Sequence, residues 1–188
     1  MKFVLTSCFA LGLGLASAQA PSERDAQVAQ VIQAATSRQE AQNDVWFKGG
    51  DFPRIKQNLR FMVEMDTTNY ESASSLGWML KSTEQPGEEW AVYVRFYKDN
   101  TDEPDGAMLL SQFLFDKRQY AAIPLIMEPR LKFGARMHAN NYRNLGHSYV
   151  RMGMWRDALR VWEAAVAAHP EDAALKLQVV RTKERLGG

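Results

Sequence analysis

Cysteine is nearly absent from this sequence. Its 188 residues include one, Cys8, which lies in an N-terminal segment that we expect to be removed. The remaining chain would then have no cysteine, so it could form no disulfide and would depend on packing for its stability. It would also have no thiol to serve as a nucleophile or as a metal ligand.

Neither sign of charge dominates. The chain has 23 Lys and Arg against 22 Asp and Glu, a formal net charge of +1. Proteins that bind nucleic acids usually show a basic excess or a basic stripe, so we expect no nucleic-acid partner. Apolar residues make up 46% of the chain and charged residues 24%, which is typical of a folded globular protein.

Recognised catalytic and metal-binding motifs are missing. The sequence has no G-x-S-x-G, Walker or dinucleotide-binding glycine pattern, and its three histidines do not stand at a metal-binding spacing. The adjacent carboxylates Glu88 and Glu89 would diverge by about 100° on a helix. We expect both to be solvated near a helix start. The sequence therefore predicts no enzyme, no metal site and no cofactor.

Long apolar runs are limited to the first residues. Lys2 is followed by an uncharged apolar stretch from Phe3 to Leu15 and then by small residues of the A-x-A type, an order typical of a secretory signal peptide. The stretch is shorter than the roughly 20 residues that span a bilayer. We therefore expect residues 1–20 to be a cleaved signal peptide. Two alternatives stay open, a buried N-terminal helix and a lipid anchor at Cys8.

Cleavage would export the protein to the periplasm or the extracellular space. The mature chain, residues 21–188, would carry no further membrane-inserting segment. Because Lys2 is the only charged residue of the signal segment, its loss would leave 22 basic and 22 acidic residues.

After Pro21 the pattern is helical. Apolar residues recur at spacings of three and four, and short breaks rich in Gly, Pro or Asp separate the segments. Residues 90–97 are aromatic and β-branched enough for a strand, but their surroundings favour a helix. The sequence predicts an all-α fold, with helical segments at 53–65, 72–81, 88–98, 107–115 and 120–131.

A repeat unit stands out between residues 139 and 170. Its diagnostic residues are large, small and helix-ending positions at fixed spacing: Tyr142, Leu145, Gly146, Tyr149, Ala158, Trp162 and Pro170. This pattern resembles the tetratricopeptide repeat, W-x2-L-G-x2-Y followed by A-x3-F and a closing P. Small residues let two antiparallel helices approach, and the aromatic residues fill the space around them.

Weaker copies precede this unit at the expected period. Leu76, Leu110 and Leu145, each followed by Gly or Ser, are spaced by 34 and 35 residues. We expect one tetratricopeptide-like domain of four repeats and a capping helix, with boundaries at 36–68, 70–102, 104–137, 139–172 and 173–188. The resemblance implies antiparallel helix pairs stacked into a right-handed superhelix.

The resemblance also implies a function, an exported protein-interaction scaffold that holds a peptide or a partner protein in a concave groove. The first helix of each pair would line the groove, with a cationic end, an apolar middle and a preference for a peptide with an acidic group. The expected groove residues are Trp78, Met108, Gln112, Phe115, Asn140, Arg143, His147 and Arg151. The alternative is a self-associating structural subunit of an envelope or surface complex.

Overall fold

Helices account for all the regular secondary structure that the computed structural model describes, which is residues 22–187. The helices in chain order are α1 (Glu23–Lys48), α2 (Phe52–Met65), α3 (Tyr70–Ser82), α4 (Pro86–Asp99), α5 (Met108–Asp116), α6 (Ile123–Met127), α7 (Ala139–Arg151), α8 (Trp155–Ala168) and α9 (Ala173–Gly187), with 3₁₀ segments η1 (Tyr120–Ala122) and η2 (Glu128–Arg136) on either side of α6. The all-α fold class is confirmed, and residues 90–97 are helical. The predicted signal peptide and Cys8 lie outside the described residues.

The described residues divide into two compact units between Arg38 and Gln39. In the first unit, Ser22 caps the start of α1, because its hydroxyl accepts from the Asp25 amide at 3.2 Å and donates to the Asp25 carboxylate at 2.6 Å. No residue of α1 is buried. None of the described helices is both long enough and apolar enough to cross a membrane.

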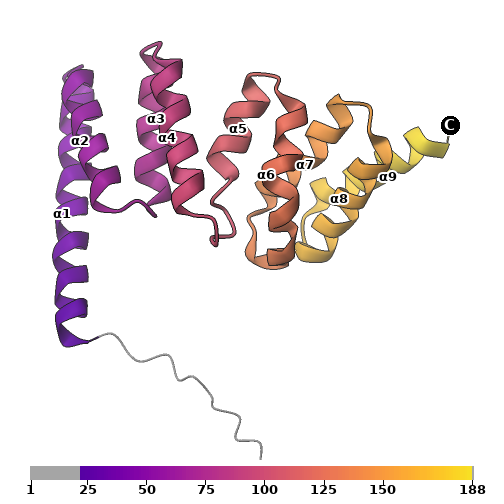
Figure 1. Ribbon diagram of the computed structural model, residues 1–188, viewed down its shortest axis with the longest axis horizontal. Coiled ribbons are helices and arrows are strands. Elements are labelled where there is room, and N and C mark those ends of the chain that lie inside the picture. The colour runs from indigo at the N-terminus through magenta and orange to yellow at the C-terminus, as the bar shows by residue number, and fades with distance from the viewer. Residues whose placement is uncertain (1–21, 188) are drawn as a thin grey trace, which may run out of the picture. The chain divides into compact units, whose positions relative to one another are not determined.

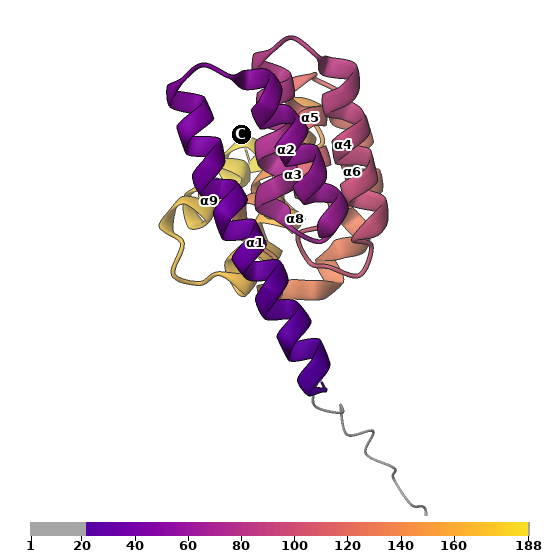
Figure 2. The same ribbon diagram turned by 90° about the vertical axis from the view of Figure 1, so that its left-hand side faces the viewer.

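The second unit is a series of helices in which each contacts its neighbour in the chain. Contacts join α2 to α3, α3 to α4, α7 to α8 and α8 to α9, and Figures 1 and 2 both show α3 and α4 side by side. Short connections make consecutive helices antiparallel. Side-chain caps define two of the starts, since Asp51 accepts from the Arg54 amide and Asn69 from the Ser72 amide.

Close helix pairing depends on glycine at two positions. A Cβ built on Gly146 would lie 2.5 Å from the Trp162 ring, and one on Gly77 would lie 2.1 Å from the Tyr93 hydroxyl. Trp162 has no exposed surface and Tyr93 is 8% exposed. The aromatic ring of the second helix therefore fills the space above the glycine of the first.

The segment after α5 departs from the single helix expected at residues 120–131. It is divided into η1, α6 and η2, and Gly134 within η2 has a φ of 54°. Pro124 and Pro129 lie in the first turns of α6 and η2, and a proline nitrogen has no hydrogen to continue an α-helical ladder. The buried Arg130 donates to the carbonyls of Asn100 and Glu103 and so ties this segment to the loop before α5.

Candidate partner-binding surface

The residues expected to line a groove belong to α3, α5 and α7. Trp78 is 53% exposed. The others divide into exposed side chains, Gln112, Asn140 and Arg151, and partly buried ones, Met108, Phe115, Arg143 and His147. Every predicted groove residue therefore keeps some exposed surface.

Four of them line one pocket between α3, α4, α5 and the start of α7, which we call the central pocket. Trp78, Met108, Gln112 and Asn140 contribute to it, and its volume is about 240 Å³. The structure thus brings together residues that lie up to 62 positions apart in the sequence. Phe115, Arg143, His147 and Arg151 are not among its lining residues.

The walls of the central pocket are aromatic and apolar, with charges at its edge. Tyr93 and Phe113 are buried, with ring centroids 6.1 Å apart. The Lys81 ammonium pairs with the Asp116 carboxylate at 2.7 Å, and the Gln112 amide donates to the same carboxylate at 3.1 Å. Both cation and anion of this pair are partly exposed, so the pair contributes little to folding stability.

Glu89 is one of the lining residues that the sequence interpretation did not place in this pocket. It lines the pocket, is 3% exposed, and its Oε2 has no hydrogen-bond partner among the described residues. The expectation of a solvated side chain is therefore wrong for Glu89. Its neighbour Glu88 is exposed and pairs with Arg60.

The spacing of Glu89 from apolar residues of the same helix could have predicted this burial. Glu89 stands four residues before Tyr93 and seven before Phe96, and all three are buried on α4. Burial raises the pKa of the Glu89 carboxyl. Lys117 and Lys81 partly offset that rise, and the Asp116 carboxylate adds to it.

A second pocket adjoins Trp78, on the side of α2 and the last turns of α1. This N-terminal pocket has a volume of about 230 Å³ and includes Phe47, Ile55 and Glu71 in its lining. The rings of Phe47 and Trp78 lie 6.3 Å apart, and those of Phe47 and Phe52 lie 5.9 Å apart. Because Trp78 lines both pockets, it forms a half-exposed wall between them.

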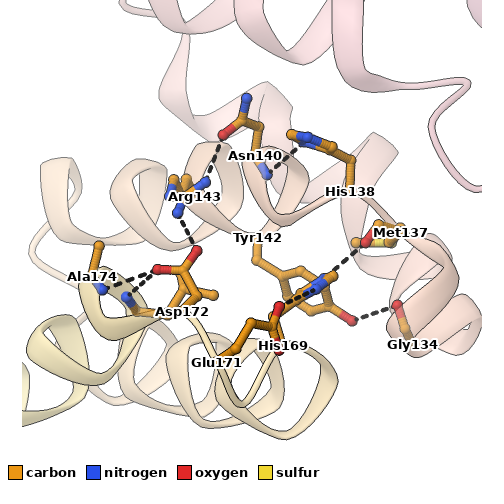
Figure 3. A network of polar contacts seen from close by, with 11 residues as sticks. Gly134, Met137, His138, Asn140, Tyr142, Arg143, His169, Glu171, Asp172 and Ala174 are labelled. Carbon is orange, nitrogen blue, oxygen red and sulfur yellow. Dashed lines mark hydrogen bonds and ion pairs between the residues drawn. The ribbon is translucent and has the colours of Figure 1, made fainter.

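The Arg143 guanidinium has an ion-pair partner and a hydrogen-bond partner within the chain. It forms an ion pair with Asp172 and donates to the Asn140 side-chain oxygen at 2.7 Å. Figure 3 shows Asp172 also accepting from backbone amides at the start of α9, including that of Ala174 at 3.0 Å. Arg143 therefore connects α7 to the loop between α8 and α9, which limits its availability to a ligand.

His147 packs against the repeat interior. Its ring lies edge-on to Trp162, with centroids 5.0 Å apart. Burial lowers the pKa of His147, and the nearby charges of Arg151 and Arg143 lower it further. Phe115 packs against Tyr120, with ring centroids 5.1 Å apart. A role for these residues in binding remains a prediction.

Metal binding has no candidate site among residues 22–187. That part of the chain contains no group of three or more His, Cys, Asp or Glu side chains close enough to share an ion. The central pocket combines aromatic walls, an ion pair and one buried carboxylate.

The helix pairs define a tetratricopeptide-like fold. No family model and no curated protein matches the sequence. Solved structures do resemble it. A crystal structure of MamA has a TM-score of 0.56 at 21% identity, covering 77% of this chain and 84% of that one. MamA 41-end from Desulfovibrio magneticus RS-1 has a TM-score of 0.58 at 14% identity, covering 80% and 85%. At these identities the similarity is one of fold.

Proposed function

We propose that this protein is an exported scaffold that binds a peptide segment of a partner protein along α3, α5 and α7. The observation that supports this most is Trp78, which is 53% exposed and forms a wall shared by two neighbouring pockets. A large aromatic side chain that stays half exposed beside cavities is typical of a binding site.

The test uses residues 21–188 and a display library of random dodecapeptides. We expect selection of peptides whose affinity falls at least about tenfold in Trp78→Ala, since truncating a central anchor costs about 2 kcal/mol or more. Phe61→Ala is the matched control, because Phe61 is 52% exposed and lies outside both pockets. Both variants should melt like the wild type. If no peptide is selected, or if both variants bind equally well, the proposed groove is wrong.

Export is a separate part of the proposal, supported by the order of charge, apolar residues and small residues in the first 20 positions. N-terminal sequencing of the protein from the periplasm or medium should give a start near residue 19 or 21. A folded cytoplasmic protein with Met1 intact would contradict export. A lipid-modified Cys8 would replace free export with a membrane anchor.

The alternative function is self-association. Helix α1 has exposed apolar side chains, including Val31 at 69% and Val45 at 61%, and such residues could be covered by a second copy. Light scattering on residues 21–188 distinguishes the two functions, because a concentration-independent monomer would exclude self-association. We propose no catalytic role, and an activity screen against glycans and peptides would test that.

A further inference from the structure

We propose that the central pocket is a receptor for a lysine side chain of the bound peptide, with Glu89 as the group that holds its ammonium. This inference rests on the proposed function and names the chemistry of the ligand at one position. It depends on the burial of Glu89, on the partners of the nearby cations, and on the apolar walls of the pocket.

The first observation is that the Glu89 carboxylate is desolvated without compensation. Its side chain is 3% exposed, and Oε2 has no hydrogen-bond partner among the described residues. Taking a carboxylate out of water is costly unless a cation or a donor compensates it. A ligand cation beside the carboxylate would supply this compensation.

The second observation is that the neighbouring cations of the chain have other partners. The Lys81 ammonium lies 2.7 Å from Asp116 Oδ2, and the Lys117 ammonium lies 5.2 Å from the centroid of the Phe113 ring. Neither forms an ion pair with Glu89 in the part of the chain described here. The charged groups that line the pocket are Lys81, Glu89 and Asp116, so an ionised Glu89 leaves it with one uncompensated negative charge.

The third observation is the character of the walls. Trp78, Met108 and Phe113 surround the polar group with apolar and aromatic surface in about 240 Å³. A lysine has a four-carbon stem that packs on apolar surface and an ammonium that is attracted to aromatic faces. The pocket thus offers a contact to each part of that side chain.

Other charged side chains fit less well. An acidic side chain would be repelled by Glu89 and Asp116. An arginine presents a planar fork that binds best to two carboxylate oxygens at once, and Oε2 of Glu89 is too deeply buried for both oxygens to be reached from the pocket. A compact ammonium needs one strong acceptor and matches that geometry.

The experiment compares four pools of N-acetylated, C-amidated nonapeptides with mixed Ala, Leu and Ser around a fixed central residue. That residue is lysine, arginine, norleucine or glutamate, and capping removes the terminal charges. Affinity is measured by fluorescence polarisation with residues 21–188. We expect the lysine pool to bind at least about tenfold more tightly than the norleucine pool, because only lysine can donate a charge-assisted hydrogen bond to Glu89 in this desolvated site.

Glu89→Gln should abolish this preference while leaving the norleucine affinity nearly unchanged. Glu88→Gln is the matched control, since it removes the same charge from the adjacent residue, which is exposed and paired with Arg60. It should keep the preference. Melting followed by circular dichroism should show both variants folded, because Glu89→Gln relieves a buried charge.

Four results would overturn the inference. A lysine preference that survives Glu89→Gln would place the ammonium elsewhere. Equal binding of lysine and norleucine, or tighter binding of arginine, would refute lysine recognition while leaving the scaffold function intact. Failure of every pool, together with failure of the random library, would overturn both proposals.

Discussion

Gly146→Ala is the sharpest test of how the helix pairs are held together. The added Cβ would lie 2.5 Å from two atoms of the Trp162 ring, where ordinary contact requires about 3.4–4 Å. Trp162 has no exposed surface, so its ring must move by about 1 Å against packed neighbours. Alanine is otherwise the better helix residue, favoured over glycine by about 1 kcal/mol.

The overlap with Trp162 and the higher helix propensity of alanine have opposite effects on stability, and we expect the overlap to be the larger effect. Forcing an extra group into a packed core costs about 1–3 kcal/mol, and the rigid ring makes the upper half of that range appropriate. We therefore expect a net loss of about 1–2 kcal/mol. For a chain of this size the melting temperature should fall by about 2–8 °C, measured by far-ultraviolet circular dichroism.

Two further variants show whether the ring is the cause. Gly87→Ala adds a Cβ that meets no atom of the described residues within 4 Å, so it should raise stability slightly. In Trp162→Phe the smaller ring lacks the two atoms nearest to Gly146. Among residues 22–187 the Trp162 Nε1 has no hydrogen-bond partner to lose. In that background Gly146→Ala should cost much less. A Gly146→Ala variant as stable as the wild type would refute this account of the pairing.

Further expected outcomes concern the last repeat, residues 139–172, and its contact with Glu128. Trp162→Ala should cost about 3–5 kcal/mol in urea denaturation, because it leaves a large cavity. Tyr149→Phe should cost about 1–2 kcal/mol, because the hydroxyl donates to the Glu128 carboxylate at 2.6 Å. Burial raises the pKa of Glu128, but the hydrogen bonds from Arg160 and Tyr149 lower it by more, so the net effect is a decrease. The stability that Glu128 contributes should thus be complete above its unfolded pKa of about 4.3 and decline as pH falls below it. Burial lowers the pKa of His147, so the native state resists its protonation and stability should decline as pH falls below about 6.5. His147→Gln should remove that part of the pH profile, as seen in melts across this range.

Helix positions were largely predictable because they depend on local spacing. The segments expected at 53–65, 72–81 and 88–98 fall within α2, α3 and α4, since apolar residues at spacings of three and four mark one face of a helix. The segment at 120–131 was predicted less well. Its prolines act on individual backbone hydrogen bonds, which a count of apolar residues does not register.

The candidate site was predictable only in part. Spacing along α3, α5 and α7 selected Trp78, Met108, Gln112 and Asn140, which line the central pocket. Spacing within one helix could not reveal that Arg143 pairs with Asp172, because that contact joins residues 29 positions apart. The cationic end of the expected groove is for that reason the least supported part of the prediction.

The amino-acid sequence by itself determined the helical class and the pairing of helices, because both follow from periodicity and from small residues opposite large ones. The tertiary structure decided which polar groups lose contact with water. Glu89 and Glu88 are adjacent and chemically identical, yet one is buried at the central pocket and the other is exposed beside Arg60. The difference arises because α3 and α5 pack on one face of α4, and desolvation depends on every element that surrounds a group.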